Sequence, residues 1–303
     1  MKKITKVSLF ILIIGLMSIS VGCSSFNAEQ GTEIISAKEA LDLFDKEDVV
    51  IVDAQGHEGY LNNHVKNSVN ITRADIVVSD PVPNLLAQKG QIEEVMSTKG
   101  ISNDSTVVIY DSNNNMDSAR LWWTLKVYGH ENIKVVSGGK KALTSAGAEM
   151  TEEVPNVSST EYKAEEKDTS MIATIEDVKS QVNNPKEDVM LIDTRTEEEY
   201  NAGTIPGSVL INYVNNNNED GTYKSPSDIQ VMYLDEGLIP EDTAIMYCKT
   251  SIRGAQTYLA LYNAGYRNLK LYDGAWVEWS KDESLPVQMP ENNEVEINQQ
   301  DVS

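Results

Sequence analysis

The chain repeats one order of strands and helices, and this repeat constrains the fold more than any other feature of the sequence. In the first copy, buried-strand patterns at residues 49–53 and 105–111 are followed by a helical stretch at 118–128 and a strand at 133–136. The matching segments of the second copy are residues 188–193, 242–247, 252–264 and 269–272. Short apolar strands that alternate with helices predict two α/β domains, each with a mostly parallel central sheet and helices on both faces.

Shifts in composition predict where these domains begin and end. We expect one domain at residues 33–150 and the other at 171–288, which suits a chain of 303 residues. Residues 151–170 between them are rich in Glu, Ser and Lys and predict a solvated linker. Residues 289–303 show no apolar periodicity, so we expect a loose tail.

The charge balance excludes one class of partner. The chain has 25 Lys and Arg against 47 Asp and Glu, a net charge of −22. A surface this acidic repels phosphate backbones, so no nucleic-acid partner is expected. The chain contains only two cysteines, Cys23 and Cys248, which provide neither a disulfide framework nor a zinc cluster.

The first residues have the pattern of an export signal. Three lysines precede an apolar stretch at residues 7–17, which is followed by small residues. Ser20-Val21-Gly22-Cys23 is similar to the bacterial lipobox, although Ser20 stands where Leu is usual. We therefore predict a lipoprotein signal peptide at residues 1–22, a lipid on Cys23 and a tether at residues 23–32. This predicts an exported, extracytoplasmic protein held at the cell membrane by its lipid, with plain secretion or an uncleaved anchor as alternatives.

Cys248 lies directly after a predicted strand and directly before a predicted helix. Backbone N–H groups at such a junction converge with the positive end of the helix dipole, and Lys249 and Arg253 add two charges, which together stabilise a thiolate. Ligand sites of open α/β sheets lie at the carboxyl ends of strands. The pattern predicts a reactive nucleophile; a small apolar residue that merely ends a strand is the alternative. The predicted binding residues are Lys249, Thr250, Ser251, Ile252 and Arg253.

Two motifs of the second copy carry a family resemblance. They are Asp193-Thr194-Arg195 with Gly203-Thr204-Ile205-Pro206-Gly207-Ser208, and Tyr272-Asp273-Gly274-Ala275-Trp276-Val277-Glu278-Trp279. With the Cys248 loop, they make the chain resemble a tandem-domain rhodanese, a thiosulfate or 3-mercaptopyruvate sulfurtransferase. In that family the C-terminal domain carries the cysteine and the N-terminal domain is a non-catalytic copy, which matches Asp111 at the place aligned with Cys248.

The resemblance implies a mechanism and a set of partners. The Cys248 thiolate would take sulfane sulfur from thiosulfate or a related donor, hold it as a persulfide and pass it to cyanide or a thiol acceptor. Arg253 would bind the anionic end of the donor, and Lys249 would steer it. No metal or organic cofactor is required, and the active site would lie in the cleft between the domains. The N-terminal domain, with Trp122 and Trp123, would be a structural partner that shapes the site.

Two residues depart from the family pattern. Thr204 replaces the usual His, and Glu199 stands where thiosulfate-using members have an anion-binding arginine, which argues against efficient use of thiosulfate. The basic residues of the loop argue for an anionic donor. We expect Asp193 and Arg195 to form an ion pair that braces the loop.

Further roles and functions remain open from the sequence. Trp276 and Trp279 either wall the pocket or pack in the core. A cysteine-dependent phosphatase or arsenate reductase would also combine a cysteine, an arginine and loop N–H groups, but it needs a longer loop than the four residues between Cys248 and Arg253. A surface-tethered binding or redox-sensing module, in which Cys248 is merely oxidised or persulfidated, is a second alternative. The motifs favour the sulfurtransferase.

Overall fold

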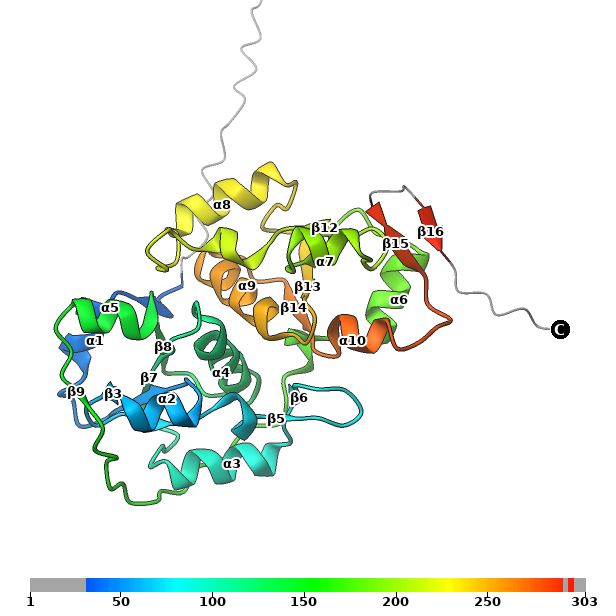
Figure 1. Cartoon of the computed structure of the whole chain (residues 1–303). Helices are drawn as coiled ribbons and strands as arrows, with labels where there is room; N and C mark the ends of the chain where they lie inside the picture. The colour runs from blue at the N-terminus through cyan, green and yellow to red at the C-terminus, as the bar shows by residue number, and fades with distance from the viewer. Residues whose placement is uncertain (1–30, 291–293, 297–303) are drawn as a thin grey trace, which may run out of the picture.

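The computed structural model describes residues 31–290 and 294–296, which form two domains of the same architecture (Figure 1). The elements of the N-terminal domain are β1 (Ile34–Ile35), α1 (Ala37–Leu43), β2 (Val49–Asp53), α2 (His57–Asn62), β3 (His64–Val65), β4 (Val69–Asn70), η1 (Arg73–Asp75), β5 (Val77–Val78), β6 (Leu85–Leu86), α3 (Lys89–Thr98), β7 (Thr106–Tyr110), α4 (Met116–Val127), β8 (Ile133–Val136), α5 (Gly139–Ser145) and β9 (Met150–Thr151).

The C-terminal domain repeats this order. Its elements are η2 (Thr169–Met171), β10 (Ile172–Ala173), α6 (Ile175–Asn183), β11 (Val189–Asp193), α7 (Glu197–Asn201), β12 (Val209–Leu210), η3 (Tyr213–Asn216), α8 (Pro226–Asp235), β13 (Thr243–Tyr247), α9 (Ile252–Asn263), β14 (Leu269–Tyr272), α10 (Ala275–Trp279), β15 (Val287–Met289) and β16 (Glu294–Glu296).

Each domain is built on a five-stranded parallel sheet, with the strand order β1-β8-β7-β2-β4 in one and β10-β14-β13-β11-β12 in the other. The central pairs share one register, because Asp53 lies beside Tyr110 in the first sheet and Asp193 beside Tyr247 in the second. Apolar runs such as Val49–Asp53 form the strands, since both faces of a parallel sheet are buried under helices. The structure confirms the predicted fold class and the repeat.

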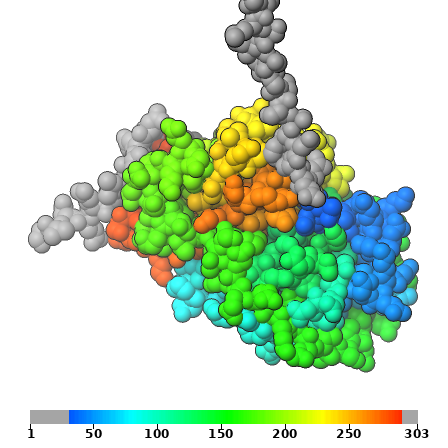
Figure 2. All heavy atoms as spheres, turned by 180° about the vertical axis from the view of Figure 1, so that it is seen from behind, coloured from blue at the N-terminus to red at the C-terminus, as the bar shows by residue number. Residues whose placement is uncertain are grey.

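The two domains pack against each other along α4 and α9, which lie side by side (Figure 1). Trp122 of α4 is buried, and its ring centroid lies 6.1 Å from that of Tyr258 and 5.2 Å from that of Tyr262, both on α9. Seen from behind, the atoms of the two domains adjoin at the surface (Figure 2). The helix that follows Cys248 is therefore covered by the other domain.

Two segments differ from the sequence prediction. Residues 151–170 join the domains, but this segment is not fully solvated, because Tyr162 and Ala164 are buried against the N-terminal domain. The predicted loose tail begins within a strand: β15 pairs antiparallel with β16, and Gln288 exchanges two backbone hydrogen bonds with Thr204. In the predicted linker, two apolar side chains anchor the segment to the N-terminal domain. In the predicted tail, strand pairing anchors the segment to the C-terminal domain.

The predicted signal peptide, Cys23 and residues 24–30 of the tether lie outside the residues that the structure describes. The last two tether residues are described, and the backbone N–H of Gly31 donates to the carbonyl oxygen of Asn263 at the end of α9. Within residues 31–290, no helix has the length and apolar character needed to cross a bilayer.

Candidate active site at Cys248

Cys248 lies at the carboxyl end of β13, between the strand and α9, and its residue is only 1% exposed. The helix begins close to the sheet because Gly254 has no side chain: a Cβ there would lie 2.7 Å from Cδ1 of Leu271. Ser251 ends the loop in the left-handed region, with a φ of 64°. The chain thus passes from strand to helix through four residues, 248–251, and holds the thiol at the turn.

The backbone N–H groups around the thiol are free of protein acceptors. Among the described residues, none of the N–H groups of residues 249–253 donates a hydrogen bond to the protein. These groups precede or open α9, where unpaired N–H groups and the helix dipole favour negative charge. Such a loop can bind the charged sulfur of a thiolate or persulfide.

In the N-terminal domain, the corresponding loop is filled by one of its own side chains. The carboxyl group of Asp111, at the place of Cys248, accepts hydrogen bonds from the backbone N–H groups of Asn113, Asn115 and Ser118 at 2.8–3.1 Å and from the Ser118 hydroxyl at 2.9 Å. Burial raises the pKa of Asp111, and the hydrogen bonds from Ser118 oppose this shift. The side chain of Asp111 therefore fills this loop and uses its N–H groups.

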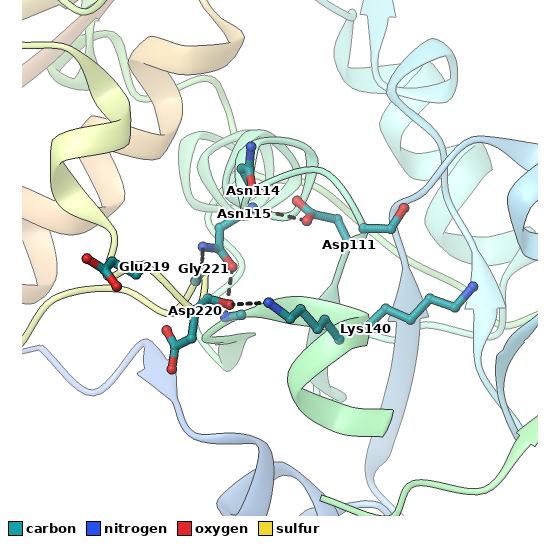
Figure 3. Close-up of a pocket in the computed structure, with 10 residues that line it drawn as sticks. Asp111, Asn114, Asn115, Lys140, Glu219, Asp220 and Gly221 are labelled. Atoms are coloured by element: carbon teal, nitrogen blue, oxygen red, sulfur yellow. Dashed lines mark hydrogen bonds between the residues drawn. The ribbon is translucent and has the colours of Figure 1, made fainter. Parts of the chain in front are cut away.

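A cavity of about 380 Å³ lies beside this filled loop (Figure 3). Asn114 and Asn115 line it from the N-terminal domain, and Asp220 and Gly221 line it from the C-terminal domain. Asn115 donates to the carbonyl oxygen of Gly221 at 2.9 Å, so the cavity lies between the domains. Because the carboxyl group of Asp111 already occupies the loop, we do not assign this cavity as the active site.

Arg253 lies on the first turn of α9 and forms an ion pair with Glu199. Its Nη1 and Nη2 donate to the two carboxylate oxygens of Glu199 at 2.6 and 2.8 Å. The hydrogen bond from Arg253 lowers the pKa of Glu199 to about 2, despite partial burial. Burial alone would lower the pKa of Arg253, but the hydrogen bond to Glu199 and the interaction with Cys248 raise it above its usual value.

The other predicted loop residues have different environments. Lys249 is exposed and has no ion-pair partner among the described residues, whereas Ser251 and Ile252 are buried. Thr250 is half-buried, and its hydroxyl accepts a hydrogen bond from the amide of Asn84 at 3.0 Å. The loop is thus exposed at Lys249 and enclosed at its other end by the N-terminal domain.

A buried arginine of the N-terminal domain holds the loop from the opposite side. Arg120 of α4 is fully buried, and its Nη1 donates to the Ser251 hydroxyl at 2.9 Å and to the Asp273 carboxylate at 2.7 Å. Asp273 also accepts from the Ser251 hydroxyl at 3.1 Å and from the backbone N–H of Leu86 at 2.7 Å. Through its Nη2, Arg120 donates to the carbonyl oxygen of Asn84 at 3.0 Å. Residues of both domains therefore fix the Cys248 loop.

A polar cluster lies behind the loop at the ends of β11 and β13. Arg195 and Asp193 form the predicted ion pair, with 2.6 Å between Nη2 and Oδ2. Thr204, in place of the family His, donates to Asp193 at 2.8 Å and lies 2.7 Å from the hydroxyl of Tyr247. The backbone N–H of Thr194 donates to the carbonyl oxygen of Tyr247 at 2.9 Å, so the cluster braces the strand that ends at Cys248.

The two tryptophans of the closing motif have different roles. Trp279 is buried, and its indole N–H donates to the carbonyl oxygen of Pro286, so it packs in the core. Trp276 is half-buried and stacks on the guanidinium of Arg195, whose carbon lies 4.5 Å from the ring centroid. Its backbone N–H donates to the carbonyl oxygen of Cys248 at 3.0 Å, which ties α10 to the loop.

Sequence reasoning missed the role of Arg120 and did not anticipate the pairing of Arg253 with Glu199. A signal for the first existed, because Arg120 is a lone charge among the apolar residues Ala119 and Leu121 of a buried helix. A buried charge needs a partner, and here the partner lies in the other domain. The second pairing joins α7 to α9 and carries no signal in the sequence.

Among the described residues, no group of three or more His, Cys, Asp and Glu side chains is arranged to hold a metal ion.

Comparison with known proteins identifies the class of this fold and site. The protein family described as Rhodanese-like domain matches this chain twice, at residues 36–146 and 174–282, once in each structural copy. The chain therefore belongs to the rhodanese family and contains two rhodanese-like domains.

Curated relatives match most of the chain. A protein of Saccharopolyspora erythraea named "Putative thiosulfate sulfurtransferase" is 31% identical over 249 residues, which cover 77% of this chain and 87% of the relative. A protein of Thermus thermophilus named "Sulfur carrier protein TtuD" is 30% identical over 226 residues, which cover 69% and 79%. These relatives place the chain in the sulfurtransferase class in general.

Solved structures share the fold. The anaerobic ergothioneine biosynthesis enzyme of Chlorobium limicola, solved with trimethyl histidine, superposes with a TM-score of 0.76 at 21% identity, covering 86% of this chain and 70% of that enzyme. At this identity the similarity concerns the fold alone.

The role of Arg120 can be tested by Arg120→Lys. A lysine keeps the charge opposite Asp273 but cannot also contact Ser251 and Asn84 in one planar arrangement, so the Cys248 loop should loosen. We expect the turnover number for sulfur transfer to fall about 10- to 100-fold, because small displacements of a reacting group have effects of this size. Steady-state kinetics with saturating donor measure it.

Arg73→Lys provides the matched control, because Arg73 forms an ion pair with Asp117 inside the N-terminal domain at 2.6 Å and does not contact the loop. Its turnover should stay within about twofold of the wild type, as expected for a partly exposed pair. Equal losses in the two variants would mean that Arg120 acts only through the stability of its domain.

Proposed function

We propose that this protein transfers sulfane sulfur through a persulfide on Cys248, taking it from thiosulfate or a related donor and delivering it to cyanide or a thiol. The observation that carries the proposal is the contrast between the two loops. In the N-terminal copy the loop N–H groups bind the side chain of Asp111, and in the C-terminal copy the corresponding groups surround Cys248 without a protein acceptor.

The first step would form the persulfide. The Cys248 thiolate attacks the outer sulfur of thiosulfate, a new S–S bond forms, and the bond to the sulfonate sulfur breaks with its electron pair leaving on sulfite. The N–H groups of residues 249–253 stabilise the negative charge on the outer sulfur of the persulfide. Arg253 on the first turn of α9 is paired with Glu199, so the loop N–H groups carry most of this stabilisation.

The second step would regenerate the thiolate. Cyanide or an acceptor thiolate attacks the outer sulfur of the persulfide, and the S–S bond breaks with its electron pair on Cys248. Because Cys248 is only 1% exposed, a small acceptor suits the site better than a bulky one.

Specific features argue against the two alternatives. Four residues separate Cys248 from Arg253, and Arg253 is bound by Glu199, so the loop is short for a phosphate and its arginine is already paired. A redox sensor gains from an accessible cysteine with a resolving partner. Cys248 is buried, and no second cysteine lies within residues 31–290.

The nucleophile is tested by Cys248→Ser. A serine has nearly the same size but its hydroxyl does not accept sulfane sulfur, so sulfur transfer should be abolished while the fold is kept. Intact-mass analysis after incubation with thiosulfate, 3-mercaptopyruvate or inorganic polysulfide should show one added sulfur atom on the wild type and none on the variant.

Asp111→Asn is the matched control in the other domain, where it should change neither the mass gain nor turnover. Sulfur transfer by the Cys248→Ser variant would refute the assignment.

We also propose that the protein is exported and held at the membrane by a lipid on Cys23. The proposal is supported by the lipobox-like sequence Ser20-Val21-Gly22-Cys23. Cys23→Ala should abolish incorporation of a labelled fatty acid and move the protein from the membrane fraction to the soluble fraction, whereas Cys248→Ala should change neither. Labelling that persists in Cys23→Ala would contradict it.

A further inference from the structure

The geometry points to Glu199 as the residue that sets the class of sulfur donor: it neutralises Arg253, so that the site favours a donor without a dianionic group, such as the persulfide of a small neutral thiol, over thiosulfate. This inference rests on the proposed function, because it concerns the donor that would load Cys248.

The ion pair leaves Arg253 little capacity for a second anion. Both Nη atoms donate to Glu199, at 2.6 and 2.8 Å, in the paired geometry in which a guanidinium would also bind a sulfonate. The side chain of Arg253 is 18% exposed and that of Glu199 is 31% exposed, so water screens the pair only in part. A dianionic donor would have to displace the carboxylate or approach its negative charge.

Glu199 is itself held in place. Its carboxylate accepts hydrogen bonds from the backbone N–H and the hydroxyl of Thr196, both at 3.1 Å, as the capping box of α7. Because the pKa of Glu199 is lowered to about 2, the carboxylate remains charged at any neutral pH. The neutralisation of Arg253 is therefore a fixed property of the folded site.

The remaining charges do not replace Arg253. Lys249 is exposed, so its charge is screened by solvent and worth little for holding a small anion. The net charge of −22 repels anions at longer range. The charges around the site therefore favour an uncharged donor over a dianion.

The loading step balances with such a donor. The Cys248 thiolate attacks the terminal sulfur of the hydropersulfide R–S–SH, a bond forms between Cys248 and that sulfur, and the donor's S–S bond breaks. The thiolate RS⁻ leaves with the electron pair, and the proton stays on the transferred sulfur as Cys248–S–SH. No oxidant or reductant enters, and the loop N–H groups bind the transferred sulfur after it loses its proton.

The test compares two donors on three proteins. The rate of Cys248 persulfide formation is measured by intact mass with thiosulfate and with the persulfide of 2-mercaptoethanol, on the wild type, Glu199→Gln and Glu198→Gln. Glu198 is the neighbouring exposed carboxylate on α7, so its variant removes the same charge without touching Arg253.

Glu199→Gln should raise the ratio of the thiosulfate rate to the persulfide rate about tenfold. The reason is that Arg253 could then form one charged hydrogen bond with thiosulfate, and a bond of this kind corresponds to about that factor. Glu198→Gln should keep the ratio within about twofold of the wild type. An unchanged or lower ratio in Glu199→Gln, or an equal rise in both variants, would overturn the inference. If neither donor adds sulfur to wild-type Cys248, the proposed function itself fails; if wild-type Cys248 accepts sulfur but the ratio does not respond, only the role of Glu199 fails.

Discussion

The buried ion pair between Arg120 and Asp273 is the interaction on which the rest of the site depends. It joins the two domains at the point where the loop of Cys248 ends, and Ser251 hydrogen-bonds to both partners. Removing one member of such a pair leaves the other charge buried without compensation, at a cost of about 3–5 kcal/mol. The N-terminal domain is therefore part of the structure that holds the Cys248 loop, although residues 33–150 contain no cysteine.

The two copies carry loops at the same place in the fold, but only the first loop is filled by its own side chain. Both place a loop between a central strand and a buried helix, with left-handed residues at its end, Asn115 in one and Ser251 in the other. In the first copy the Asp111 carboxyl group accepts the hydrogen bonds of the loop N–H groups. In the second copy the N–H groups of residues 249–253 donate to no protein acceptor among the described residues, and Arg253 forms an ion pair with Glu199.

The sequence predicts the fold well because strands such as Val49–Asp53 are read from local apolar runs and because the repeat checks each assignment twice. Cys248 and its loop are predictable because they lie between a predicted strand and a predicted helix. The Asp193–Arg195 ion pair is predictable because the two residues are close neighbours in the sequence. The contacts of Arg120 with Ser251 and of Arg253 with Glu199 depend on how separate elements pack, and sequence spacing does not encode them. The burial of Tyr162 and the β15–β16 pairing escape prediction because short apolar signals lie in polar segments.

The most direct test of the account is a crystal structure of the full chain after incubation with the persulfide of 2-mercaptoethanol. The account predicts one extra sulfur on Cys248, within hydrogen-bonding distance of backbone N–H groups of residues 249–253, with the contacts of Arg120 and Glu199 retained and the loop at Asp111 unchanged. An extra sulfur that points away from these N–H groups, or a Cys248 that stays unmodified, would contradict it.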